Sequence, residues 1–105
     1  MLMTDSSRHV DMPSPFKNIS EAWESNPTYR CPCCKSKTLH GRGAYEGCPV
    51  CFWEDDGQDE HDADVVRGGP NGELSLRQAQ ANYREFGAKH RKYIGKVSKP
   101  RSEEL

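Results

Sequence analysis

The sequence predicts a small α+β domain, in which short antiparallel strands of zinc-ribbon type are capped by one C-terminal helix. Two Cys-Pro-x-Cys motifs separated by 13 residues, with short apolar or β-branched segments beside them, predict the strands and their turns. A run of helical periodicity near the C-terminus predicts the helix. At 105 residues, of which 33% are hydrophobic, the chain is long enough for one domain and too short to bury a large core.

The N-terminal residues are expected to lie outside this domain. Residues 1–17 are rich in Ser, Asp and Pro, a composition typical of a disordered leader. They contain no apolar run of the length that a secretory signal needs, and no stretch of the chain approaches transmembrane length. We therefore expect a cytoplasmic protein that makes no membrane contact. In a reducing compartment, clustered cysteines favour a metal over disulfides.

The domain is expected to span residues 18–100, followed by a short tail at 101–105. Asn18 and Glu21 have the spacing of a capping box, which predicts a short helical turn before the domain proper. Pro27 ends that turn, because the residue before a proline disfavours the helical conformation. Trp23 inside the turn is expected to anchor the segment on the domain.

The cysteine spacing C-x2-C-x13-C-x2-C predicts a tetrahedral zinc site. Two cysteines with two residues between them can bind one ion from a single tight turn, and proline after the first cysteine stiffens that turn. Such a closed four-sulfur site leaves no position for water or substrate, so the zinc is expected to be structural. The predicted ligands are Cys31, Cys34, Cys48 and Cys51.

Two further residues near the motifs are open to more than one interpretation. Cys33 is expected to be a small buried or partly exposed thiol, and the alternatives are that it replaces Cys34 as a ligand or serves as a redox-active thiol. His40 is expected to be an exposed loop histidine, and the other interpretation is an alternative metal ligand six residues past Cys34. Thiol redox chemistry through Cys-x-x-Cys is disfavoured, because that motif normally precedes a helix in a βαβ unit.

Zinc would also supply stability that the small hydrophobic core of this chain cannot provide. Four thiolates around one zinc contribute on the order of 10–16 kcal/mol at neutral pH, comparable to or above the whole net stability of a domain. The formal net charge is -1 with neutral cysteines. Four ionised thiols and one Zn²⁺ change that charge to -1 - 4 + 2 = -3. The strongly basic balance of a typical nucleic-acid binder is absent.

An acidic segment follows the second motif, at residues 54–64. We interpret it as a solvated loop; the alternatives are a recognition surface for a basic partner, or a second metal or acid–base site that includes His61. Its carboxylates do not alternate as a calcium loop requires. We predict that a partner protein docks on the rim where this segment leaves the metal site. The residues of that rim are Trp53, Glu54, Asp55 and Asp56.

The C-terminal helix is predicted over Leu76 to Phe86. Ser75 and Gln78 have capping-box spacing, and Gly87 is a plausible C-cap. A short strand is expected just before, at Val65-Val66, followed by a strong turn signal at residues 68–72. The apolar helix face is expected to pack on the strands; its residues are Leu76, Ala79, Tyr83 and Phe86.

Several motifs, in one order along the chain, resemble the bacterial cysteine-rich CPCC family. The resemblance covers about residues 29–100 and implies a small zinc-ribbon-type protein, with no activity attached. It rests on Cys31-Pro32-Cys33-Cys34, the block from Cys48 to Gly57, the turn Gly68-Gly69-Pro70-Asn71, and the helix residues Ser75, Leu76, Ala79, Asn82, Tyr83, Phe86 and Gly87.

The function that the sequence favours is a non-enzymatic, zinc-stabilised binding module that acts through protein–protein contacts. One version is an immunity-type or regulatory protein whose acidic loop mimics a nucleic-acid backbone towards a basic toxin; it rests on charge and on the resemblance. The alternative is a nucleic-acid-binding zinc ribbon that uses the basic tail from Lys89 to Arg101. An enzyme is disfavoured, because no phosphate loop and no nucleophile elbow are present.

Overall fold

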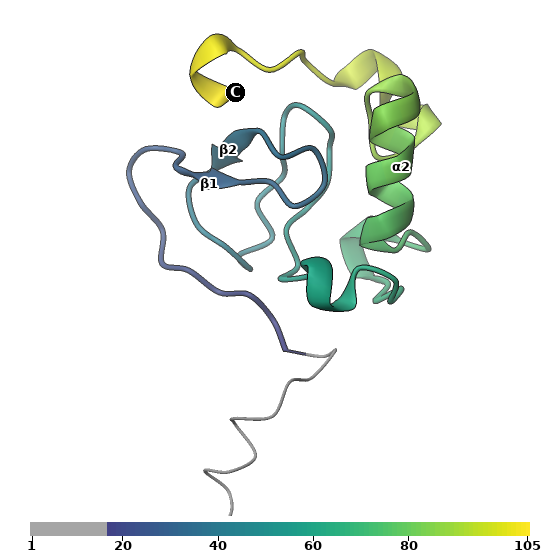
Figure 1. Cartoon of the computed structure of the whole chain (residues 1–105), viewed down its shortest axis with the longest axis horizontal. Coiled ribbons are helices and arrows are strands. Elements are labelled where there is room, and N and C mark those ends of the chain that lie inside the picture. Colours follow the sequence, from purple (N-terminus) through teal and green to yellow (C-terminus); the bar gives the residue numbers. More distant parts are fainter. Residues whose placement is uncertain (1–16) are drawn as a thin grey trace, which may run out of the picture.

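The computed structural model describes residues 17–105 and places a pair of short strands beside one α-helix (Figure 1). The strands β1 (Tyr29–Arg30) and β2 (Lys37–Leu39) are antiparallel, with Tyr29 opposite Leu39. The helix α2 (Leu76–Phe86) stands along one side of them. The predicted α+β class is confirmed at this level. The predicted leader lies outside the described residues, except for Lys17.

Four short 3-10 helices complete the secondary structure of the described residues. They are η1 (Glu60–Asp62), η2 (Gly69–Asn71), η3 (Arg91–Lys96) and η4 (Ser102–Glu104). The segment after α2 passes over the strands, and η4 lies against β2 (Figure 1). The predicted tail at 101–105 therefore contains a packed element.

The helix α2 forms where local signals predict it. The Ser75 hydroxyl accepts a hydrogen bond from the Gln78 N–H at 3.1 Å, and the Gln78 carboxamide oxygen accepts one from the Ser75 N–H at 2.8 Å. Gly87 ends the helix in the left-handed region, with φ of 87°, and donates its N–H to the Tyr83 carbonyl at 2.9 Å. Leu76 on the inner face is fully buried.

The C-cap gives a direct test of this helix end. A Cβ at position 87 would meet no atom within 4 Å, so Gly87→Ala changes backbone strain alone. We expect it to destabilise the protein by about 1–2 kcal/mol. Gly95→Ala is the matched control, because Gly95 also has open space and has no positive φ. The control should leave the free energy of unfolding unchanged or raise it slightly. Equal effects of the two variants in denaturant titration would contradict the assignment.

Two local predictions are wrong. The segment from Asn18 to Pro27 is extended instead of helical, because its backbone pairs with distant residues. Glu21 forms an antiparallel bridge with Arg42, and the Glu24 N–H donates to the His40 carbonyl at 2.7 Å. The predicted strand at Val65-Val66 is reduced to one bridge, between Val66 and Ser75.

Trp23, which the sequence predicts to anchor this segment on the domain, contacts the domain at its surface. Its side chain is 59% exposed, and its ring stacks on the His40 ring with a centroid separation of 4.8 Å and an interplanar angle of 8°. The extended backbone places this residue at the surface, where one ring face is covered and the other is open to solvent.

Candidate metal centre

The first cysteine motif forms a tight turn after β1. The Lys35 N–H donates to the Cys31 carbonyl at 2.8 Å, and the Cys31 N–H donates to the Ser36 carbonyl at 2.9 Å. Lys35 has a φ of 69°, in the left-handed region that non-glycine residues rarely adopt. The turn therefore holds both ends of the motif together despite the conformational cost.

The second motif repeats the same turn, residue for residue. The Phe52 N–H donates to the Cys48 carbonyl at 2.8 Å, the Cys48 N–H donates to the Trp53 carbonyl at 2.9 Å, and Phe52 has a φ of 75°. A bridge between Gly47 and Glu54 closes its base. The chain thus builds two matching knuckles, one from residues 31–36 and one from residues 48–53.

The two knuckles bring the four predicted sulfurs together. All four lie within 4.8 Å of one another, and Cys31 to Cys51 and Cys34 to Cys48 are separated by 3.6 and 3.7 Å. Four sulfurs at about 2.3 Å from a central ion, at tetrahedral angles, lie about 3.8 Å apart. A disulfide requires about 2.05 Å, and all five cysteines are free. The spacing therefore fits a tetrathiolate metal site and does not fit a disulfide pair.

Hydrogen bonds favour thiolates at this site. The Thr38 hydroxyl lies 3.0 Å from the Cys48 sulfur, and the Trp53 backbone N–H donates to the Cys51 sulfur at 3.5 Å. Contacts with the neighbouring thiols and with Thr38 hold the pKa of Cys48 far below its usual range, whereas burial raises the pKa of Cys31. Without a cation, ionisation of one sulfur opposes ionisation of its neighbours, and the Cys48 charge contributes to the raised pKa of Cys31. A divalent ion would let all of them ionise.

The helix α2 and the segment after it hold the knuckles in place. Gln80 on α2 is buried and donates to the Pro32 carbonyl of the first knuckle at 2.9 Å. The Lys89 N–H donates to the Cys51 carbonyl at 2.8 Å.

Of the predicted apolar face, Leu76, Ala79 and Tyr83 belong to or pack against the core cluster that contains the cysteines. Burial, followed by the nearby cysteine charge, raises the pKa of Tyr83. Phe86 instead lies under the Arg91 guanidinium, at 5.0 Å.

Cys33 and His40 both lie outside the four-sulfur group. Cys33 is buried, with 4% of its surface exposed. The ring of His40 lies between Trp23 and Glu46, and its Nδ1 is 2.7 Å from the Glu46 carboxylate. The alternative in which His40 replaces a cysteine ligand is therefore not supported by the geometry.

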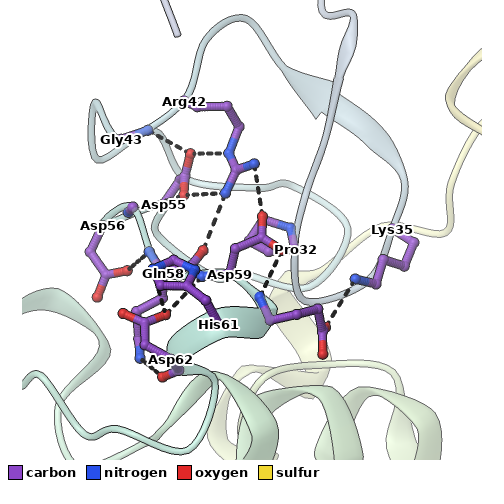
Figure 2. Close-up of polar contacts among 12 residues, drawn as sticks. Pro32, Lys35, Arg42, Gly43, Asp55, Asp56, Gln58, Asp59, His61 and Asp62 are labelled. Atoms are coloured by element: carbon purple, nitrogen blue, oxygen red, sulfur yellow. Dashed lines mark hydrogen bonds and ion pairs between the residues drawn. The ribbon is translucent and has the colours of Figure 1, made fainter. Parts of the chain in front are cut away.

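The acidic segment is not the solvated loop that the sequence predicts. Asp55 is fully buried and accepts hydrogen bonds from Arg42 Nε at 2.9 Å and from the Gly43 N–H at 2.8 Å (Figure 2). Arg42 also pairs with Asp59 at 3.0 Å and donates to the Gln58 carbonyl at 3.2 Å. This part of the segment is an internal scaffold for the loop that carries the second knuckle.

Among the remaining carboxylates of the acidic segment, some are buried and others are exposed. Asp62 is buried and pairs with Arg67, and burial raises the pKa of Asp56. Glu60 is exposed and contacts Gln80, Arg77 and Lys35, which together lower its pKa to about 2. Within residues 17–105, the only group of candidate metal ligands is the four cysteines, so the second metal site suggested for this segment is not formed.

The predicted docking rim also requires correction. Trp53 and Asp55 have no exposed surface, and Asp56 is 5% exposed. Trp53 is the largest fully buried side chain of the described residues and belongs to the same core cluster as the cysteines. Its role is therefore packing beside the metal site. Of the four rim residues, Glu54 alone is partly exposed.

Sequence reasoning missed the polar partners that complete this arrangement. Arg42 lies between two glycines, and nothing in its local sequence indicates that it pairs with Asp55, 13 residues later. Asn71 was assigned only to a turn, yet its side chain makes two hydrogen bonds to the Glu54 backbone, at 2.8 and 3.1 Å. Both contacts join residues that are far apart in the sequence, and both are made by polar groups. Hydrophobic periodicity therefore does not predict them.

The fold and the cysteine cluster define a small α+β protein with a candidate metal centre. A family model described as "Cysteine-rich CPCC" matches residues 29–104. The chain belongs to this family, which confirms the resemblance found in the motifs. No curated protein and no solved structure matches the chain.

Membrane insertion through a helix has no support in the part of the chain that the structure describes. None of its helices combines the length and the apolar character needed to cross a bilayer.

Proposed function

We propose that this chain is a non-enzymatic binding module whose fold is held by one structural Zn²⁺. The observation that carries the proposal is the pair of matching knuckles, which place four sulfurs at separations suited to a tetrahedral ion of zinc size. Thiolates in a tetrahedron suit zinc, with iron as the main competitor. The strand pair and the knuckles support a zinc-ribbon-like architecture.

A structural role follows from the chemistry of the donor set. Zn²⁺ held by four cysteines has no coordination position left for water or substrate, so it does not activate either one. Cys34 is the only one of the four with partial exposure, and the others are buried. The useful surface of the protein is therefore outside the metal centre.

The surface best suited to a protein partner lies beside Trp23 rather than beside Trp53. Trp23 and Tyr45 are 59% and 56% exposed, and Trp and Tyr are enriched at protein interfaces and their hot spots. Trp23 stacks on His40, whose ring is held by Glu46, the neighbour of Tyr45 in the chain. This arrangement pre-positions aromatic surface, which lowers the entropy lost on binding.

An immunity-type or regulatory protein is one version of this module. Several carboxylates of residues 54–64 are buried and paired. The most exposed acids of this segment are therefore Glu60 and Asp64, with side-chain exposures of 54% and 82%. Both already contact Arg77. Mimicry of a nucleic-acid backbone would therefore rest on few charges, and contact through the aromatic surface is the better supported version.

Copurification from the native cell, followed by mass spectrometry, tests the protein-partner function. We expect a partner to be recovered with the unmodified chain and lost with Trp23→Ala, because that change removes exposed ring area without touching the core. Val66→Ala is the matched control: Val66 is 52% exposed and is expected to retain the partner. Equal recovery with both variants would reject this surface.

The nucleic-acid alternative is tested by the same preparation. Lys89 is buried, and Arg91 and Arg101 pair with acidic side chains, so the basic tail offers fewer free charges than its sequence suggests. Tight binding of RNA or DNA at low salt, with a steep loss of affinity as salt is raised, would favour the alternative. We expect no such binding.

A further inference from the structure

A cavity in the described part of the chain lies away from the four cysteines. It has a volume of about 600 Å³, between the glycine-rich turn that contains η2 and the segment that begins η3. This volume is within the range of sites for small molecules. The residues that supply its charge are Lys89, His90, Lys92 and Glu73.

Lys89 is an unusual residue for the wall of such a cavity. It is 3% exposed, and within residues 17–105 its ammonium group contacts uncharged partners alone: Asn71 Oδ1 at 2.9 Å, the Pro70 carbonyl at 3.5 Å and the face of the Tyr93 ring at 5.2 Å. Among the described residues, no carboxylate lies within ion-pair distance of it. A buried ammonium without a counter-charge is costly. An anion in the cavity would remove that cost.

A second cation reinforces the charge at the same place. Lys92 lies over the Tyr93 ring at 5.2 Å, so the two ammonium groups share one aromatic ring. Lys92 is exposed and, within the described residues, has no acidic partner. Glu73 is the one acidic residue of the lining. With His90 neutral, the lining carries two positive charges and one negative charge.

The glycine-rich turn at residues 69–72 forms another part of the lining. Gly69 and Gly72 have φ of 64° and 61°, and a Cβ at either position would meet no atom within 4 Å. The turn is fixed in place by Asn71, whose side chain bonds to the Glu54 backbone and accepts from Lys89. A ligand can therefore approach this turn closely at positions 69 and 72, while the Gly72 N–H is already bonded to the Gly69 carbonyl at 3.0 Å.

We propose that this cavity binds the phosphoryl group of a small phosphorylated molecule. A phosphate monoester carries close to two negative charges at neutral pH and three acceptor oxygens, which match the two ammonium groups of the lining. The cavity is larger than inorganic phosphate requires, so the remainder of a phosphate ester fits beside Pro70 and Leu74. Lys89 anchors the phosphoryl group, and Lys92 adds the second charge.

Titration of the zinc-loaded full chain, followed by ¹⁵N–¹H NMR at constant ionic strength, tests the proposal. The probes are inorganic phosphate, ribose 5-phosphate and adenosine 5′-monophosphate, with chloride as the ionic control. We expect saturable shifts at residues 69–74 and 89–93 with an ester and weaker binding of inorganic phosphate. The proposal would be overturned if none of the probes caused a saturable shift at concentrations up to roughly 10 mM, where even weak binding is detected.

Variants of exposed residues separate the site from a general charge effect. Lys92→Gln should weaken binding of the ester by about tenfold, because it removes a charge that attracts the phosphoryl group. Glu73→Gln should tighten binding severalfold, because it removes a charge that repels that group. Lys99→Gln is the control, since Lys99 does not line the cavity, and it should change nothing. Equal effects of Lys92→Gln and Lys99→Gln, or shifts confined to residues 96–101, would overturn the assignment. In that case Lys89 serves only to hold Asn71.

Discussion

Removal of the proposed zinc ion is expected to unfold the domain rather than to loosen it. Structural zinc contributes on the order of 10–16 kcal/mol, whereas the net stability of a domain is about 5–15 kcal/mol. The described core is small and is built around the ligands themselves, with Leu39, Trp53 and Leu76 as its largest fully buried hydrophobic side chains. Addition of a strong chelator at pH 7 should abolish the near-ultraviolet circular dichroism, and added zinc should restore it.

Two cysteine variants make this prediction specific to the ligand set. Cys48→Ser removes a sulfur that belongs to the four-sulfur group, and we expect loss of stoichiometric zinc and of the folded state. Cys33→Ser is the matched control, because Cys33 is buried nearby and is outside the group. It should keep one zinc per chain, with only a modest loss of stability. A folded, reduced, metal-free chain, or loss of zinc in the Cys33 variant, would contradict the assignment.

The features that were predicted from the sequence are the ones that short segments determine. The knuckle is a local turn whose hydrogen bonds join residues four and five positions apart, so spacing alone was enough to predict that it could bind a metal. The helix α2 is bounded by Ser75 and Gly87, and both caps act within a few residues. In each case the chemistry and the sequence signal occupy the same short stretch.

The features that were missed depend on contacts between distant segments. The residues after Asn18 are extended because their backbone pairs with residues near 40 and 57, which overrides a local capping-box pattern. The acidic segment is folded inward because Arg42 reaches it from the preceding loop. A count of carboxylates predicts a solvated surface, and only the position of their cationic partners shows that several are internal.

The same contacts make Asp55 the residue with the largest expected effect outside the metal site. Asp55 and Arg42 have side-chain exposures of 1% and 9% and are joined at 2.9 Å (Figure 2). The Asp55 carboxylate also accepts from the Gly43 N–H at 2.8 Å and the Gly57 N–H at 3.3 Å. Asp55→Asn keeps the size of the side chain, but it removes the buried charge of the pair and leaves Asp59, at 3.0 Å, as the remaining ion-pair partner of Arg42. We expect a loss of about 3 kcal/mol in the free energy of unfolding of the zinc-loaded protein, at the lower end of the range for a broken buried pair.

A double-mutant cycle and an exposed pair show whether this effect comes from the buried charge. Arg42→Met combined with Asp55→Asn should cost less than the sum of the two single changes, because the double variant leaves no unpaired charge in the pair. Asp64→Asn is the matched control: Asp64 also pairs with an arginine, at 3.5 Å, but its side chain is 82% exposed and screened by solvent. The control should leave the denaturation midpoint unchanged. Similar losses for Asp55→Asn and Asp64→Asn would show that the Arg42 pair does not scaffold the second knuckle, because a stabilising buried pair must cost more to break than a solvated one.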